Sequence, residues 1–180
     1  MDLAKIEKGV RLILEGVGED VYRDGIKDTP KRVAQMYEEI LSGINQKPEI
    51  EAGFSEEVGD DIILIKDIPF YSMCEHHLLP FFGKVHLAYA PQNNLVAGFS
   101  TLTKLVEIYS RRLQLQERLT HQIADAIMEQ LKPRGTIVVI EAQQLCVSMR
   151  GSKKDVVRMV TQALRGEISI ERLQFNQLFK

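Results

Sequence analysis

Two cysteines, Cys74 and Cys146, and a pair of adjacent histidines place the strongest constraint on how this chain folds. Cys74 and His77 are three positions apart, a spacing at which two side chains can bind one metal ion. If Cys146 is a third ligand, the fold must bring residues 74–77 and a distant segment together. Three protein ligands leave tetrahedral zinc one open position, which is typical of catalytic rather than structural sites. The pattern predicts a zinc enzyme that activates water.

Other readings of the same residues stay open at this point. A structural zinc would need a fourth ligand from His86 or His121, although neither has ligand-like spacing. Cys146 by itself is equally consistent with a small buried hydrophobic residue. His76 is either a general acid or base beside the metal or a solvated loop histidine. Glu75 is either a partner of a ligand histidine or a surface carboxylate.

The overall composition excludes several classes of protein. The chain has 180 residues, of which 44% are hydrophobic and 27% charged, with a net charge of −2. No broad basic surface is available for a nucleic acid backbone, and no apolar run reaches the length of a membrane span. The N-terminus has no signal-peptide pattern. We therefore expect a cytoplasmic protein that binds neither nucleic acid nor membranes.

The hydrophobic pattern predicts an α+β fold. Residues 1–45 are expected to be helical, with Thr29 capping a second helix that has Pro30 at its first position. Residues 44–60 are interpreted as a linker, and the domain boundary is placed between an N-terminal helical region, 1–58, and a catalytic domain, 59–180. Strands and helices then alternate in pairs, which favours antiparallel hairpins. The predicted elements are strands at 62–65 (buried on both faces), 84–89, 137–150 and 155–165, helices over 102–113 and 119–131, and a short helix capped by Ser169.

The expected strand around Cys146 predicts a ligand pocket. Side chains alternate along a strand, so Gln144, Cys146, Ser148 and Arg150 would share one face. Arg150 would then lie roughly 13 Å from Cys146, where its guanidinium suits an anionic group at the far end of a ligand. Gln114, Gln116 and Glu117 could read the hydrogen-bonding edge of a base, or simply form a polar helix face.

Four segments together resemble the GTP cyclohydrolase I family. They are residues 28–33, 72–81, 116–120 and 146–151, in the order and spacing of that family. The resemblance implies a helical N-terminal appendage on a T-fold, which is an antiparallel ββααββ unit, and assembly of T-folds into a toroidal homodecamer with active sites between subunits. It also implies a reaction: water activated at zinc attacks C8 of GTP, formate leaves, and 7,8-dihydroneopterin triphosphate forms.

The resemblance also assigns roles to individual residues. Cys74, His77 and Cys146 are implied to hold Zn²⁺, and His76 to transfer protons near the opening ring. Glu117 is implied to anchor the guanine edge. The further residues with an implied part in substrate binding are Gln116, Ser100, Arg32, Lys104 and Arg150.

Three positions depart from the family pattern. Gln144 replaces a histidine two residues before the late zinc ligand, and a glutamine cannot carry a proton at neutral pH. Thr101 replaces the lysine that usually follows the phosphate-binding serine. Lys104 replaces an arginine, which keeps the charge but loses the bidentate fork.

These departures leave alternatives to the full reaction. The reaction could halt at a formamidopyrimidine or deformylated intermediate, act on a less phosphorylated purine, or be absent from a homologue that only binds nucleotides. Another T-fold enzyme, a nitrile reductase with a nucleophilic cysteine, is a further alternative. Bound zinc would argue against that reductase, because Cys74 and His77 would then be metal ligands.

Overall fold

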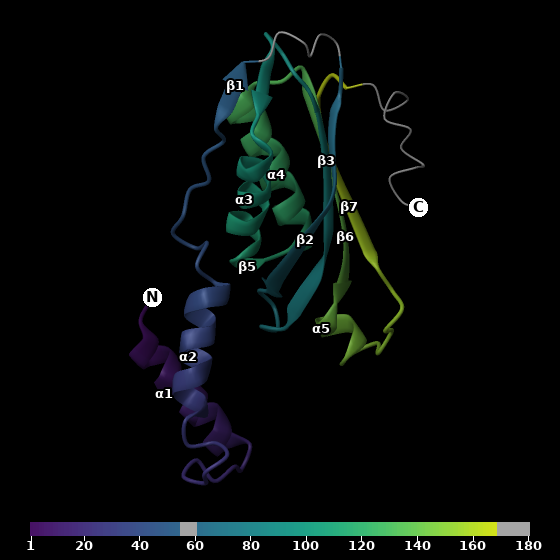
Figure 1. The fold of residues 1–180 in the computed structure, drawn as a ribbon. Coiled ribbons are helices and arrows are strands. Elements are labelled where there is room, and N and C mark those ends of the chain that lie inside the picture. Colours follow the sequence, from purple (N-terminus) through teal and green to yellow (C-terminus); the bar gives the residue numbers. More distant parts are fainter. Residues whose placement is uncertain (55–60, 169–180) are drawn as a thin grey trace. The chain divides into compact units, whose positions relative to one another are not determined.

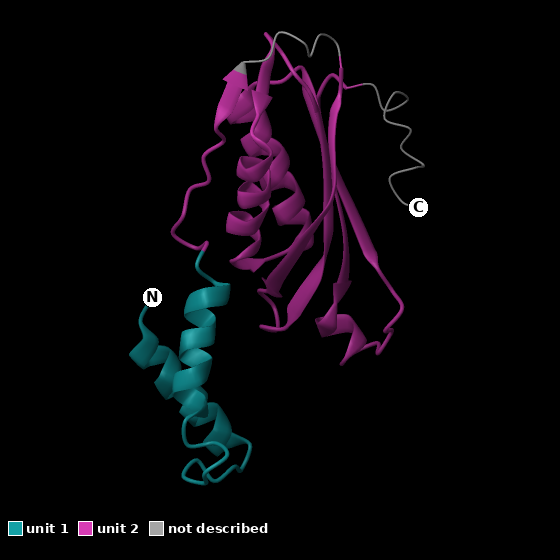
Figure 2. Cartoon of the chain, viewed as in Figure 1, with its two compact units in different colours: residues 1–42 teal, residues 43–180 magenta. Residues whose placement is uncertain are grey.

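The chain forms two compact units, residues 1–42 and 43–180 (Figure 2). We describe each unit from a computed structural model, which covers residues 1–54 and 61–168. The predicted domain boundary, between residues 58 and 59, lies outside the described residues and stays a prediction. So does the helix expected to begin at Ser169.

The N-terminal unit consists of two amphipathic helices in contact, α1 (Leu3–Gly16) and α2 (Thr29–Ile40). The Asp2 carboxylate caps α1 by accepting a hydrogen bond from the Lys5 amide at 3.0 Å. Thr29 was expected to be the cap of α2, but it is the first helical residue, and Asp28 occupies the cap position. Proline near the start of α2 fits the expectation, because its missing N–H has no partner within the helix.

The larger unit is built on a five-stranded sheet with the order β5-β2-β3-β6-β7 (Figure 1). The four long strands pair antiparallel, whereas the short β5 runs parallel to β2. The strands of this sheet are β2 (Ile63–Cys74), β3 (Pro80–Ala90), β5 (Leu113–Gln114), β6 (Gly135–Gln144) and β7 (Met159–Gly166). A separate two-stranded sheet pairs β1 (Ala52–Phe54) with β4 (Leu95–Ala97), so the expected linker over 44–60 contains a strand.

Helices α3 (Phe99–Ser110) and α4 (Gln116–Leu131) pack on one face of this sheet (Figure 1). The apolar face predicted for residues 84–89 is confirmed, because Val85, Leu87 and Tyr89 are almost fully buried in the core beneath these helices. The opposite face of this strand is buried too, at His86 and Ala88. The predicted apolar stripe of α4 is also buried: Leu119, Ile123, Ala126, Ile127 and Leu131. The long elements therefore follow the order ββααββ, and the predicted α+β class is confirmed.

Two strand predictions were wrong. The strand at 62–65 is not buried on both faces, because Leu64 is 37% exposed. The strand expected to reach Arg150 ends at Gln144, and residues 145–148 form a helical turn, α5 (Leu145–Ser148). The ladder stops there because its partner β3 begins at Pro80, one residue beyond the Phe81–Gln144 pair, and proline has no N–H to donate.

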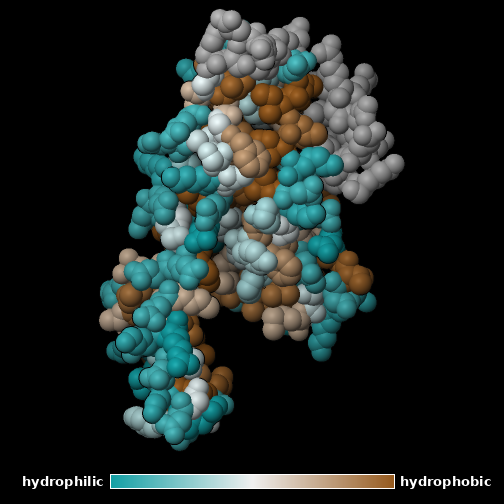
Figure 3. Space-filling view, viewed as in Figure 1, coloured by the Kyte–Doolittle hydropathy of each residue, from teal (hydrophilic) through white to brown (hydrophobic). Residues whose placement is uncertain are grey.

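The surface is mixed in polarity (Figure 3). Hydrophobic residues gather on the visible face of the larger unit. The exposed apolar side chains of this unit include Tyr71 and Phe99. Within the described residues, no helix is both long and apolar enough to span a membrane. The cytoplasmic location stays a prediction.

Candidate metal centre and active site

Cys74, His77 and Cys146 come together, as the sequence predicted. One ligand atom from each lies within 4.8 Å of the others. Cys74 is buried at the end of β2, His77 is exposed in the following turn, and Cys146 is half-buried in α5. These three are the group of ligand-type side chains found in the described part of the chain, and neither His86 nor His121 belongs to it.

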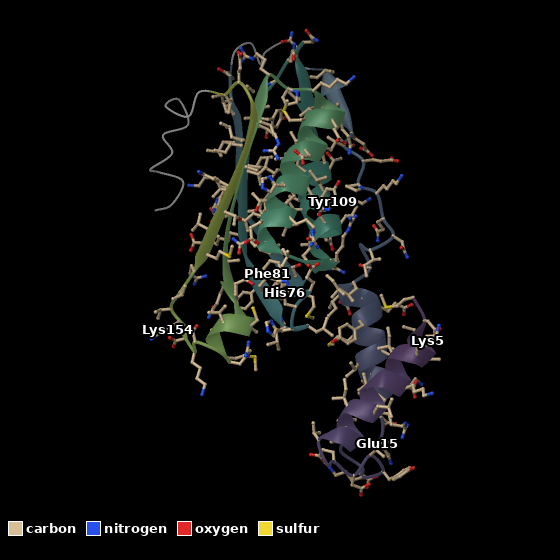
Figure 4. The ribbon with its side chains drawn as sticks, turned by 180° about the vertical axis from the view of Figure 1, so that it is seen from behind. Lys5, Glu15, His76, Phe81, Tyr109 and Lys154 are labelled. Atoms are coloured by element: carbon tan, nitrogen blue, oxygen red, sulfur yellow. The ribbon has the colours of Figure 1, made fainter. Side chains whose placement is uncertain are left out.

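The turn between β2 and β3 holds two of these ligands in a fixed backbone. The Cys74 amide donates to the Leu79 carbonyl and the Leu78 amide to the Cys74 carbonyl, both at 2.9 Å. Leu78 adopts a left-handed conformation, with φ of 52°, which closes the turn. His76 lies in this turn, at the same end of the sheet as Phe81 (Figure 4). The His76 and His77 rings meet edge to face with centroids 6.3 Å apart, so His76 stands next to the ligand group.

The helical turn α5 changes what surrounds Cys146. Gln144, Cys146, Ser148 and Arg150 do not share a strand face, so the separation of Arg150 from Cys146 that was predicted for an extended strand was wrong. Helical residues advance only about 1.5 Å each, so Arg150 returns toward the ligands, and its Nη1 lies 3.2 Å from His77 Nε2. Burial raises the pKa of the Cys146 thiol, and the adjacent Cys74 raises it further. A bound cation would offset this effect, because metals bind the thiolate form.

Gln144 is held by a buried amide network. Its Nε2 donates to Oε1 of Gln116 at 2.8 Å. Gln116 is almost fully buried, and its own Nε2 contacts the carbonyl oxygens of Ile140 and Met159, both at 3.0 Å, and the Thr161 hydroxyl at 3.2 Å. The side chain of Gln116 is therefore used within the fold, where it connects α4 to β6 and β7.

Glu117 follows Gln116 in the first turn of α4 and is exposed. The positive end of the helix dipole favours a carboxylate at this position. The next residue, Arg118, forms a two-pronged ion pair with Glu75 in the turn between β2 and β3, in which the second contact, Nη2 to Oε1, measures 3.0 Å. This pair holds the pKa of the Glu75 carboxyl below its usual value.

Apart from Arg150, which lies beside His77, the residues with implied phosphate contacts belong to other elements of the chain. Ser100 and Lys104 of α3 line a cavity of about 690 Å³ whose lining does not include Cys74, His77 or Cys146. Arg32 lies on α2 of the N-terminal unit, 3.8 Å from the Asp28 carboxylate. Thr101, which stands where the family pattern has a lysine, is buried, and its hydroxyl donates to the Gly98 carbonyl at 2.8 Å.

One residue of the site region, Arg118, was not singled out from the sequence, and another, Gln114, has a different role from the expected one. Arg118 was unremarkable as one charge among several on a polar helix face, and only the fold shows that it meets Glu75. Gln114 is almost fully buried, with its Nε2 donating to the Tyr109 carbonyl at 3.0 Å and to Gln122 Oε1 at 2.7 Å. The sequence suggested that the Gln114 amide reads a base edge, whereas the structure uses this side chain within the fold.

Comparison with known proteins agrees with this site. The family model of GTP cyclohydrolase I matches residues 6–180. The chain belongs to the GTP cyclohydrolase I family. GTP cyclohydrolase 1 of Carboxydothermus hydrogenoformans is 57% identical over 168 residues, covering 92% of this chain and 87% of that protein. GTP cyclohydrolase 1 of Streptococcus mutans is 54% identical over 167 residues, covering 92% and 86%.

A solved structure supports the fold assignment. The apo form of an archaeosine synthase, QueF-Like, aligns with a TM-score of 0.50 and 18% identity, covering 60% of this chain and 96% of that one. At this identity the likeness concerns the fold alone. Membership of the family therefore rests on the sequence matches, and the geometry of the three ligands agrees with them.

Proposed function

We propose that this protein hydrolyses GTP to 7,8-dihydroneopterin triphosphate and formate, with zinc held by Cys74, His77 and Cys146. The convergence of these three side chains within 4.8 Å is the observation that carries the proposal. Two thiolates and one imidazole match the ligands zinc prefers, and they leave one position for water. A zinc ion bound there supplies a Lewis acid that activates water near neutral pH.

The chain's own residues bind the purine and move protons around it. Glu117, exposed at the start of α4, accepts hydrogen bonds from the guanine edge. His76 stands beside the ligand group and exchanges protons with the opening ring, since its reference pKa is close to neutral pH. Gln144 donates to Gln116 and can orient a neighbouring group, but it cannot carry a proton. Gln116 supports this arrangement from inside the fold.

The triphosphate site is proposed to form between subunits. Ser100 and Lys104 line a cavity to which the metal ligands of the same chain do not contribute. In a toroidal homodecamer, these residues would serve the metal centre of a neighbouring subunit. Arg32 and Arg150 add the positive charge that a triphosphate requires, and Arg150 is already next to His77.

Gln144 supports a second candidate, a reaction that stops early. The full conversion needs several proton transfers, and a general acid–base group typically contributes about 10²–10⁴-fold to a rate. Without a histidine at position 144, ring opening could be faster than the later steps, so that a formamidopyrimidine accumulates.

Product analysis distinguishes these candidates. The zinc-loaded protein is incubated with GTP, GDP, GMP or guanosine, and products are followed by absorbance and mass spectrometry. We expect dihydroneopterin triphosphate and formate from GTP, with smaller rates as phosphates are removed. A product that keeps the formyl group would support the early stop, and unchanged GTP in the presence of bound zinc would contradict both enzymatic functions.

A further inference from the structure

The residues on both sides of Glu117 are attached to the two segments that carry the metal ligands. On one side, Arg118 contacts Glu75, the residue directly after the ligand Cys74. On the other side, Gln116 accepts a hydrogen bond from Gln144, two residues before the ligand Cys146. The carboxylate proposed to bind guanine is thus flanked by two links to the metal centre.

The Glu75–Arg118 contact has the geometry that fixes orientation. Both guanidinium Nη atoms meet a separate carboxylate oxygen of Glu75. Such two-pronged pairs restrict rotation as well as distance, which a single contact from a lysine cannot do. The pair also joins residues far apart in the sequence, so it is not a local feature of one helix.

Backbone hydrogen bonds also hold the end of β2 beside β5, the short strand that directly precedes α4. β5 pairs with the end of β2 through Met73–Leu113 and Cys74–Gln114. The Glu75 amide continues this ladder by donating to the Gln114 carbonyl at 3.1 Å. The ladder stops before α4 begins at Gln116, and the Arg118 side chain supplies the next attachment.

The Glu75–Arg118 pair contributes little to the stability of the fold. The Glu75 side chain is 29% exposed and that of Arg118 is 43% exposed, and ion pairs at such positions contribute little to the free energy of unfolding. We therefore expect that loss of the pair changes the position of the first turn of α4 relative to the metal ligands, with little effect on stability.

We propose that Glu75 and Arg118 are positioning residues, which hold the guanine-binding carboxylate of Glu117 at a fixed place relative to Cys74 and His77. This inference rests on the proposed function, because it takes Glu117 as the guanine anchor. In this proposal, the purine is recognised jointly by α4 and the turn between β2 and β3, which one ion pair holds together.

Discrimination between GTP and inosine triphosphate (ITP) tests the proposal. ITP lacks the 2-amino group that Glu117 would bind, so the ratio of kcat/KM for the two nucleotides reports on that contact. In the zinc-loaded full-length protein, Arg118→Met keeps an apolar stem of similar reach and removes the pair. We expect KM for GTP to rise and the GTP-to-ITP ratio to fall by about tenfold or more, with zinc content unchanged.

Two further variants make the outcome decisive. Glu75→Gln preserves the shape of the side chain and should produce the same fall in the ratio, even if Arg118→Met does not fold. The double variant should lose no more than either single variant, because residues acting as a pair are not additive. A ratio that stays at the wild-type value in the folded Glu75→Gln protein would overturn the proposal, and so would full additivity.

A matched control comes from the same helix. Arg165 pairs with Asp125 of α4 at 2.7 Å, with side-chain exposures of 33% and 49%. Arg165→Met should leave the GTP-to-ITP ratio unchanged. An equal fall in this variant would show that any loosening of α4 lowers the ratio, and would overturn the proposal. If the wild type binds GTP without turnover, the proposed function fails, whereas the ratio of dissociation constants for GTP and ITP still tests this inference.

Discussion

Among single side chains, the three ligand candidates show how far residue type and spacing lead. Cys74 and His77 lie close together because they are near in sequence and bracket a tight turn. Cys146 joins them through the fold, since β6 pairs with β3 and ends beside the β2–β3 turn. The three residues predicted to converge do so, although the prediction placed Cys146 on a strand and the structure places it in a helical turn.

Cys146→Ser should abolish metal binding under ordinary conditions. The hydroxyl of serine stays protonated near neutral pH and is a far weaker ligand for zinc than a thiolate. We expect less than stoichiometric zinc by elemental analysis after dialysis, and loss of GTP turnover. Ser148→Ala, in the same helical turn, should retain both. Full zinc occupancy in Cys146→Ser would remove this residue from the ligand set.

Gln144→His should accelerate pterin formation. A histidine there would introduce a proton carrier next to the ligand group, an effect typically worth about 10²–10⁴-fold when proton transfer limits the rate. The measurement is the rate of pterin absorbance from GTP as a function of pH. Gln143→His is the control, because Gln143 donates to the Asp155 carbonyl instead of Gln116. Equal rates for wild type and Gln144→His would show that the missing histidine is not limiting.

Among helices and strands, the elements with a regular apolar pattern were the predictable ones. The stripe of α4 and the predicted apolar face of β3 both lie in the core, although His86 and Ala88 on the other face of β3 are buried as well. The end of β6 was not predictable, because Val147 and its neighbours favour a strand locally. Strand termination there depends on Pro80 at the start of β3, a partner that the local sequence does not reveal.

Only part of the candidate site could be predicted from the sequence. Ligand candidates at short spacing could be predicted, whereas contacts between distant polar residues could not. The Gln116–Gln144 and Glu75–Arg118 contacts join segments that meet only when the sheet and α4 have assembled. Each of these residues alone is consistent with an ordinary polar surface, so the sequence contained no signal for the pairing.

Ile127→Ala tests the packing of α4 on the sheet. Ile127 is fully buried in the core, and truncating such a residue typically costs about 2–5 kcal/mol. We expect a lower urea midpoint, measured at fixed protein concentration because assembly also affects stability. Ile127→Val, which removes one methyl group, should cost about 0.5–1.5 kcal/mol. An alanine variant as stable as the valine variant would contradict the burial of this side chain.

For the molecule as a whole, the sheet of the larger unit has two strand edges to consider. β7 ends one side of the described sheet, and β5 covers only Met73 and Cys74 of β2 on the other. Long unpaired edges favour pairing with another chain. Exposed apolar side chains such as Tyr71, Phe99 and Val160 add to this tendency. These features support the proposed ring of subunits.

Mixing two inactive variants tests whether active sites form between subunits. Cys146→Ser removes the metal ligand, and Lys104→Glu reverses a charge in the separate cavity lined by α3. Each variant alone should be inactive. Co-expressed, they should recover part of the wild-type turnover, because some sites combine intact ligands from one subunit with an intact Lys104 from another. Mixed assemblies that remain inactive would place both residues in sites within one subunit.

Titration of zinc into the metal-free protein, with pterin formation from GTP as the readout, decides whether this chain uses Cys74, His77 and Cys146 as a catalytic metal centre. We expect the rate to rise in proportion to added zinc and to level off at one equivalent per subunit. A metal-free protein that is already fully active, or a zinc-saturated protein that leaves GTP unchanged, would contradict the account.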